Sequence, residues 1–318
     1  MTTTPVAFES RISSRRLVDP NLIPDWVALV IARPYSADEL RAVIAEAEAL
    51  LGESLDDLLQ SWKLGRSSTT PPRYPHRFLD LLQRMRRASE HPGNLIADDA
   101  AAVAAAEVSG LMQTFDSWRD DPVWPEFQSA FQDPRNFLHA VVTLSMASAL
   151  RERHQRTELV ASGVQGGSAD LRMVVTEHDW LEVEVKTSLA LSNRRTAMEF
   201  SEALKFVTTQ VRKPTKGGRR QLGEDRPGML VIGGVEIDNA TFQALGDAAG
   251  HVLERGRRRP NLVAVVISKT FAVEPTVEYG RVIVQFGHMS RIRSNPQYAG
   301  NLRFVGRWDG EWRLEKVG

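Results

Sequence analysis

Charged and apolar residues alternate in the segment 181–188, LEVEVKTS. Successive side chains of a β-strand point to opposite faces, so Glu182, Glu184 and Lys186 share one face and the residues between them face a core. This trio lies near the carboxyl end of its strand, where α/β sheets commonly build their sites. The alternative interpretation is that the trio forms the solvated face of an antiparallel strand.

A further carboxylate, Asp170, precedes this strand in the segment 169–176. If the two segments form a hairpin with its turn near residues 177–179, Asp170 lies close to Glu184 and Lys186. Carboxylates from two strands can share a hard divalent cation such as Mg²⁺, which prefers oxygen ligands. Lys186 beside that cation could orient or help deprotonate a water and counter the charge of a phosphate.

The order Asp170, a spacer of thirteen residues, then Glu184-Val185-Lys186 resembles the motif of the PD-(D/E)xK nuclease superfamily, which has the restriction-endonuclease-like fold. The resemblance implies that Asp170 and Glu184 bind Mg²⁺, with Mn²⁺ as a substitute. It also implies that the backbone carbonyl of Val185 is a third oxygen ligand and that Lys186 is the catalytic lysine.

The resemblance covers roughly residues 135–270, and Ala169 stands where the motif has a proline. Some members add an acidic residue from the first core helix or strand, for which Glu152 and Glu158 are both candidates here. Others place a glutamine on the helix that follows the lysine strand, and Gln210 is the counterpart that the resemblance implies.

Basic residues that could contact a nucleic-acid backbone follow the lysine strand. The first cluster consists of Arg212, Lys213, Lys216, Arg219 and Arg220, and a second of Arg255, Arg257, Arg258 and Arg259. Phosphate contacts dominate nucleic-acid affinity, so these clusters predict a binding surface. Their alternative is solvated loop charge. Arg172 is either a cross-strand partner of Glu182 or Glu184, or a phosphate contact.

Two regions differ in their patterning. Residues 1–134 have helical periodicity, including a segment with Ser36 and Glu39 as a capping box and Gly52 as its end, and predict a helical accessory domain. Residues 135–318 alternate strand-like and helical segments, which predicts an α/β domain with a mixed sheet flanked by helices. A terminal hairpin is expected over 302–317.

Charge follows the same division. Residues 1–150 hold 14 Lys/Arg and 20 Asp/Glu, a net charge of −6, and residues 151–318 hold 26 and 20, a net charge of +6. The absence of cysteine excludes disulfides and thiolate metal sites and favours a cytoplasmic location. No apolar run reaches the ~20 residues of a membrane span. His178 and His288 are expected in turns or at the surface.

These features predict a Mg²⁺-dependent nuclease that hydrolyses phosphodiester bonds, in DNA rather than RNA. The resemblance suggests a setting in restriction, phage defence or repair. The first alternative is a catalytically inactive protein of the same fold that binds nucleic acid or acts as a scaffold, and the second is an enzyme of another class. The N-terminal helical region is the expected contact for a partner protein or a second copy of the chain.

Overall fold

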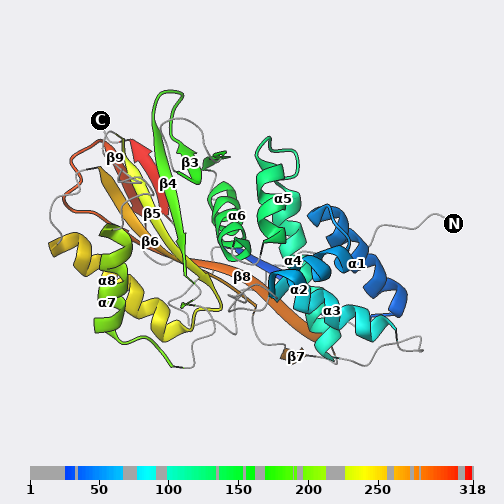
Figure 1. Ribbon diagram of the computed structural model, residues 1–318. Coiled ribbons are helices and arrows are strands. Elements are labelled where there is room, and N and C mark those ends of the chain that lie inside the picture. Colours follow the sequence, from blue (N-terminus) through cyan, green and yellow to red (C-terminus); the bar gives the residue numbers. More distant parts are fainter. Residues whose placement is uncertain are drawn as a thin grey trace.

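The computed structural model shows an α/β protein in which one mixed sheet lies between two layers of helices (Figure 1). It describes residues 26–32, 35–66, 77–90, 99–133, 136–152, 155–161, 169–188, 190–191, 196–212, 226–255, 261–272, 276–278, 281–306 and 312–316. The α/β class expected from the alternating segments is confirmed.

The described residues of the N-terminal region form one strand and five helices. They are β1 (Trp26–Ala32), α1 (Ala37–Leu51), α2 (Leu55–Arg66), α3 (Arg77–Ser89), α4 (Asp99–Asp116) and α5 (Trp124–Gln132). The expected capping box opens α1, where the Ser36 and Glu39 side chains each accept a hydrogen bond from the other's backbone N–H, and Gly52 ends the helix at φ 75°. The region is mainly helical, as expected, but its first described element is a strand.

The second part of the chain alternates helices and strands. It contains α6 (Phe137–Glu152), β2 (Arg156–Leu159), β3 (Leu171–Val174), β4 (Trp180–Thr187), α7 (Phe200–Arg212), β5 (Gly228–Val235), α8 (Asn239–Arg255), β6 (Leu262–Ala272), β7 (Thr276–Glu278), β8 (Arg281–Ser294), β9 (Leu302–Gly306) and β10 (Trp312–Lys316). The last two form the expected terminal hairpin, whose Asp309-Gly310 turn lies outside the described residues.

The strand order of the large sheet is β2-β3-β4-β5-β6-β8-β1, with β7 also paired to β8. The central strands β4, β5 and β6 are parallel, whereas β2, β3, β8 and β1 join by antiparallel pairing. Parallel strands at the centre require helical crossovers, which α7 and α8 supply. The N-terminal region thus adds an edge strand, β1, to a sheet whose other strands all come from the second part.

Two hydrophobic cores hold the layers together. One continuous cluster joins α1–α6 to β2–β6 and β8, and the other joins α7 and α8 to the opposite face of β5 and β6. Helix α6 lies directly on the face of the sheet that is opposite to α7 and α8 (Figure 1). It packs tightly against Gly233 of β5, where an added Cβ atom would lie 2.4 Å from the Val142 Cγ1 atom. Only a glycine at this position lets α6 pack so near to β5.

The two histidine predictions have different outcomes. His178 is exposed in the turn between β3 and β4, as expected. The prediction for His288 was wrong, because it is fully buried in β8 opposite Thr270. Strand β8 runs on to Ser294, so His288 lies within the strand and not in a turn after it.

Candidate active site

The hairpin of β3 and β4 brings the predicted residues together. Its turn is closed by Val175 and Thr176, whose backbone N–H groups both donate to the Asp179 carbonyl, and by the Thr176 hydroxyl, which donates to the Asp179 carboxylate. This turn fixes a register in which Leu171 pairs with Val183. Asp170, one residue before β3, therefore lies at the level of Glu184, and the expected hairpin is confirmed.

Asp170 is held from three directions. Its backbone N–H donates to the Val183 carbonyl at 2.9 Å, and its own carbonyl accepts from the Val160 N–H at 3.1 Å. Its side-chain Oδ2 accepts from the Val185 N–H at 2.6 Å, and its Oδ1 lies 3.0 Å from Nε2 of His139. These bonds fix the carboxylate beside β4, at the backbone N–H of Val185.

Glu184 is a buried carboxylate, with 3% of its surface exposed. One carboxylate oxygen pairs with the Lys186 ammonium, and the other, Oε2, is buried and has no hydrogen-bond partner among the described residues. Burial, reinforced by the charge of Asp170, raises the pKa of Glu184 to about 7, against the opposing effect of Lys186 and His139. An orphaned acceptor of this kind is rare in a protein core, and it points to a cation or a proton as the missing partner.

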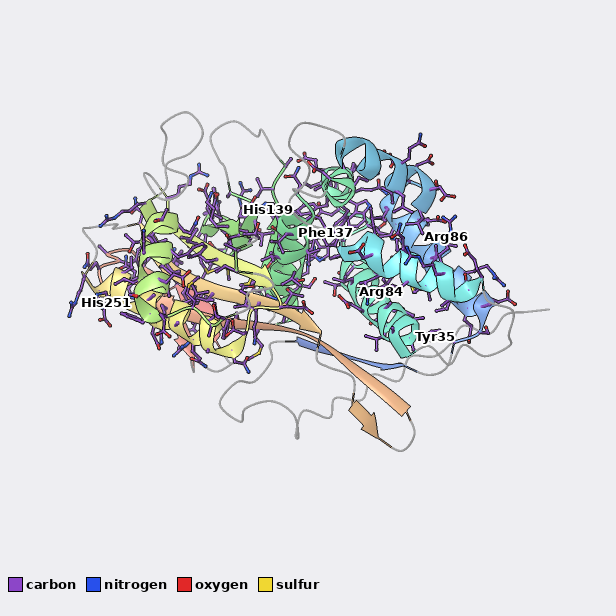
Figure 2. The ribbon with its side chains drawn as sticks, turned by 60° about the horizontal axis from the view of Figure 1, so that its bottom comes forward. Tyr35, Arg84, Arg86, Phe137, His139 and His251 are labelled. Carbon is purple, nitrogen blue, oxygen red and sulfur yellow. The ribbon has the colours of Figure 1, made fainter. Side chains whose placement is uncertain are left out.

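His139 is the site residue that sequence reasoning missed. It lies in the first turn of α6, which faces the sheet, and Figure 2 labels it at this end of the helix. Burial lowers the pKa of this imidazole, but the hydrogen bond and the charge of Asp170 outweigh burial, so the pKa is raised overall. The only sequence signal was a polar residue near the start of an otherwise apolar helix, and that pattern is common in helices without a site.

The donor set fits a hard cation in its chemistry. Asp170 and Glu184 offer carboxylate oxygens, and Oε2 of Glu184 is unpartnered among the described residues. The Val185 carbonyl is the third oxygen that the sequence resemblance implies. Within the described ranges, no group of three or more histidine, aspartate and glutamate side chains has the arrangement of a metal site. A cation here would therefore rest on two carboxylates and a backbone carbonyl, with water as the remaining ligand, a pattern that suits Mg²⁺.

Of the two alternative acidic residues, the structure describes the side chain of Glu158 alone, and the contacts of Glu158 lie away from this centre. Glu158 lies on β2, where it bonds Arg156 at 3.1 Å and faces Arg172 at 3.9 Å. Glu152 is the last residue of α6, and its side chain lies outside the described part. Arg172 is the cross-strand register partner of Glu182, as one of the two alternatives expected, and its guanidinium lies 3.9 Å from the Glu158 carboxylate. The other alternative, a phosphate contact, stays a prediction.

The remaining predicted nucleic-acid contacts are only partly described. Gln210 and Arg212 lie in the last turn of α7, and within the described residues neither hydrogen-bonds Asp170 or Lys186. Arg255 is exposed at the end of α8. Seven other basic residues lie outside the described residues: Lys213, Lys216, Arg219, Arg220, Arg257, Arg258 and Arg259.

No family model, curated protein or solved structure matches this chain. Among the helices that the structure describes, none combines the length and the apolar character needed to cross a bilayer.

Proposed function

We propose that this protein is a metal-dependent nuclease of the PD-(D/E)xK type with a restriction-endonuclease-like core. The observation that carries the proposal is the convergence of Asp170, Glu184 and Lys186 at the end of one hairpin. The element order α6-β2-β3-β4-α7-β5 also supports it. This order of a helix, three strands, a helix and a strand resembles that of the core of the PD-(D/E)xK superfamily.

Each residue has a role in this proposal. Asp170, Glu184 and the Val185 carbonyl would hold Mg²⁺, and the chemistry it would supply is polarisation of the phosphodiester and a lower pKa of a bound water. The Lys186 ammonium orients the attacking water and counters the negative charge that develops on the phosphate. His139 fixes the orientation of the Asp170 carboxylate through the bond between Nε2 and Oδ1. Glu184 would bind a metal in its deprotonated form, so this carboxyl, whose pKa is raised to about 7, would have to lose its proton on binding.

A specific observation favours a second candidate, a non-cleaving nucleic-acid-binding protein. Both Asp170 oxygens are already hydrogen-bonded, to His139 and to the Val185 N–H, and Lys186 pairs with Glu184. In this alternative, these contacts neutralise the carboxylates without a metal, and the site is a structural ion-pair cluster. The two candidates differ in one measurable property, which is metal-dependent cleavage.

Cleavage is tested with supercoiled plasmid, linear duplex and single-stranded DNA in Mg²⁺, Mn²⁺ or EDTA. We expect cleavage in either metal and none in EDTA, and we expect Glu184→Gln to abolish it. Glu177→Gln is the matched control, because it removes an exposed carboxylate from the turn of the same hairpin. If the wild-type protein cleaves none of these substrates in either metal, or if Glu184→Gln cleaves as fast as Glu177→Gln, the nuclease proposal is wrong.

A further inference from the structure

A cluster of basic and aromatic side chains continues from the candidate active site along the same face of the sheet. Residues 180, 182, 184 and 186 of β4 alternate with its buried residues, so Trp180 shares a face with Glu184 and Lys186. Arg172 of β3 is the register partner of Glu182, which places it on this face as well. Arg226 lies two residues before β5, the neighbour of β4 on its other side.

Two guanidinium groups lie over one indole. The Arg172 Cζ atom is 5.1 Å from the Trp180 ring centroid, and the Arg226 Cζ atom is 4.8 Å from it. Both distances are within the range of a cation–π contact. The indole thus contacts two positively charged groups, Arg172 from the β3 side and Arg226 from the β5 side of β4.

Neither guanidinium is hydrogen-bonded to the carboxylate beside it. Arg172 is 3.9 Å from Glu158, and Arg226 is 3.8 Å from Glu182. Both distances exceed the 2.7–3.2 Å of an N–H···O hydrogen bond. These carboxylates reduce the local positive charge, but they leave the guanidinium N–H groups available to a second anion.

Two buried donors in the same cluster lack an acceptor. Among the described residues, neither Nε of Arg172 nor Nε1 of Trp180 has a hydrogen-bond partner, although both atoms are shielded from the surface. Buried polar atoms normally have a hydrogen-bond partner, so each of these two atoms requires an explanation. Since both atoms are N–H donors, the missing partner must supply acceptor oxygens.

We propose that Arg172, Trp180 and Arg226 form a phosphate-binding site, here called the arginine–tryptophan clamp. Its ligand is a backbone phosphate of the nucleic acid that the active site acts on, so the clamp rests on the proposed function. Phosphate oxygens accept hydrogen bonds from guanidinium and indole N–H groups, and their negative charge suits two arginines that contact the same indole.

The clamp has a defined position relative to the proposed chemistry. Trp180 precedes Glu184 by four residues of the same strand, which corresponds to ~13 Å at ~3.3 Å per residue. The clamped phosphate would be a neighbour of the cleaved phosphate and not the cleaved one itself. Its contact fixes the register of the strand on the protein without reading a base.

The test measures binding in EDTA, where no cleavage can occur. A fluorescein-labelled oligothymidylate and a labelled duplex of the same length are titrated with the full chain at several salt concentrations, and anisotropy gives the dissociation constant. The variants are Arg226→Gln, whose side chain is 54% exposed, and Trp180→Phe, which keeps an aromatic ring but removes the donor. Arg119→Gln, an exposed arginine beyond α4, is the charge-matched control.

We expect each clamp variant to weaken binding, and Arg226→Gln to lower the slope of log affinity against log salt by about 1. Arg119→Gln should bind like the wild type. If the variants lose affinity for the duplex alone, the clamped phosphate belongs to a duplex. If they lose affinity for the oligothymidylate alone, it belongs to a single strand. Both results support the clamp.

Wild-type affinity and slope in both clamp variants would overturn the clamp, and so would a wild-type protein that binds neither probe. Circular dichroism and thermal unfolding must show that the variants are folded. Cleavage in Mg²⁺ is measured separately. Cleavage with unchanged binding in the variants leaves the nuclease proposal standing without the clamp, whereas clamp-dependent binding without cleavage leaves the clamp standing and favours the non-cleaving candidate.

Discussion

Stability of the metal-free protein should depend on pH through Glu184. The pKa of this carboxyl is about 7 in the folded chain, whereas 4.5 is the ordinary value of a glutamate and applies to the unfolded chain. The folded state therefore binds the proton more tightly than the unfolded state does. The resulting contribution to stability is fully present below pH 4.5 and is lost as the pH rises through about 7. The physical cause is the burial of a charge beside Asp170, which Lys186 offsets only in part.

The magnitude follows from the same pKa values. At about 1.4 kcal/mol per pKa unit, the difference between 4.5 and about 7 corresponds to about 3 kcal/mol of unfolding free energy. His139 acts in the same direction, because its pKa is raised too, and its contribution is present below 6.5 and lost as the pH rises through the folded value. The wild-type protein in EDTA should therefore be less stable in mild base than in mild acid.

Urea denaturation in EDTA between about pH 5 and about pH 8 measures this loss. Glu184→Gln should remove most of it, because the amide is not ionised at either pH, and His139→Gln should remove a smaller part. Mg²⁺ at about 100 times its dissociation constant should return ~2.7 kcal/mol to the wild type at the higher pH, but nothing to Glu184→Gln. If the unfolding free energy of Glu184→Gln falls with pH as steeply as that of the wild type, the assignment of the pH dependence to this carboxyl is wrong.

Three further substitutions test other parts of the structure. Lys186→Ala should slow cleavage by about 10²–10³ while the fold is kept, and a folded variant that cleaves at the wild-type rate would contradict the role of the lysine. Asp170→Asn should stop cleavage by weakening metal affinity, so excess Mn²⁺ should restore part of the rate, and a loss that no metal concentration changes would contradict this role. Gly233→Ala should cost about 1–3 kcal/mol in urea denaturation, because its Cβ would collide with Val142. Unchanged stability would show that α6 can withdraw freely from β5.

The hairpin at the centre of the site could be predicted because its determinants are local. Alternation in β4 assigned Glu184 and Lys186 to one face, and the short turn between β3 and β4 fixed the register that brings Asp170 to them. Periodicity and turn length are both visible within about twenty residues of sequence, so no distant contact was needed.

The missed features depend on distant contacts. His139 joins the site only because α6 packs across the sheet and points its first turn at Asp170, 31 residues away. Strand β1 is an apolar run without a clear period, and its assignment requires its partner β8. Short apolar runs cannot be assigned to strand or helix from periodicity alone, and tertiary pairing decides between them.

The pairing of β1 with β8 has a consequence for synthesis. Strand β1 begins at residue 26, and its partner begins at residue 281. At ~5–20 residues per second, a ribosome needs roughly 13–50 s to make the residues between them. During that interval β1 has no partner, while α1–α5 can already fold from local contacts. The pairing of β1 with β8 must therefore be one of the last steps of folding. A chaperone that shields extended apolar segments would act on β1 during this interval.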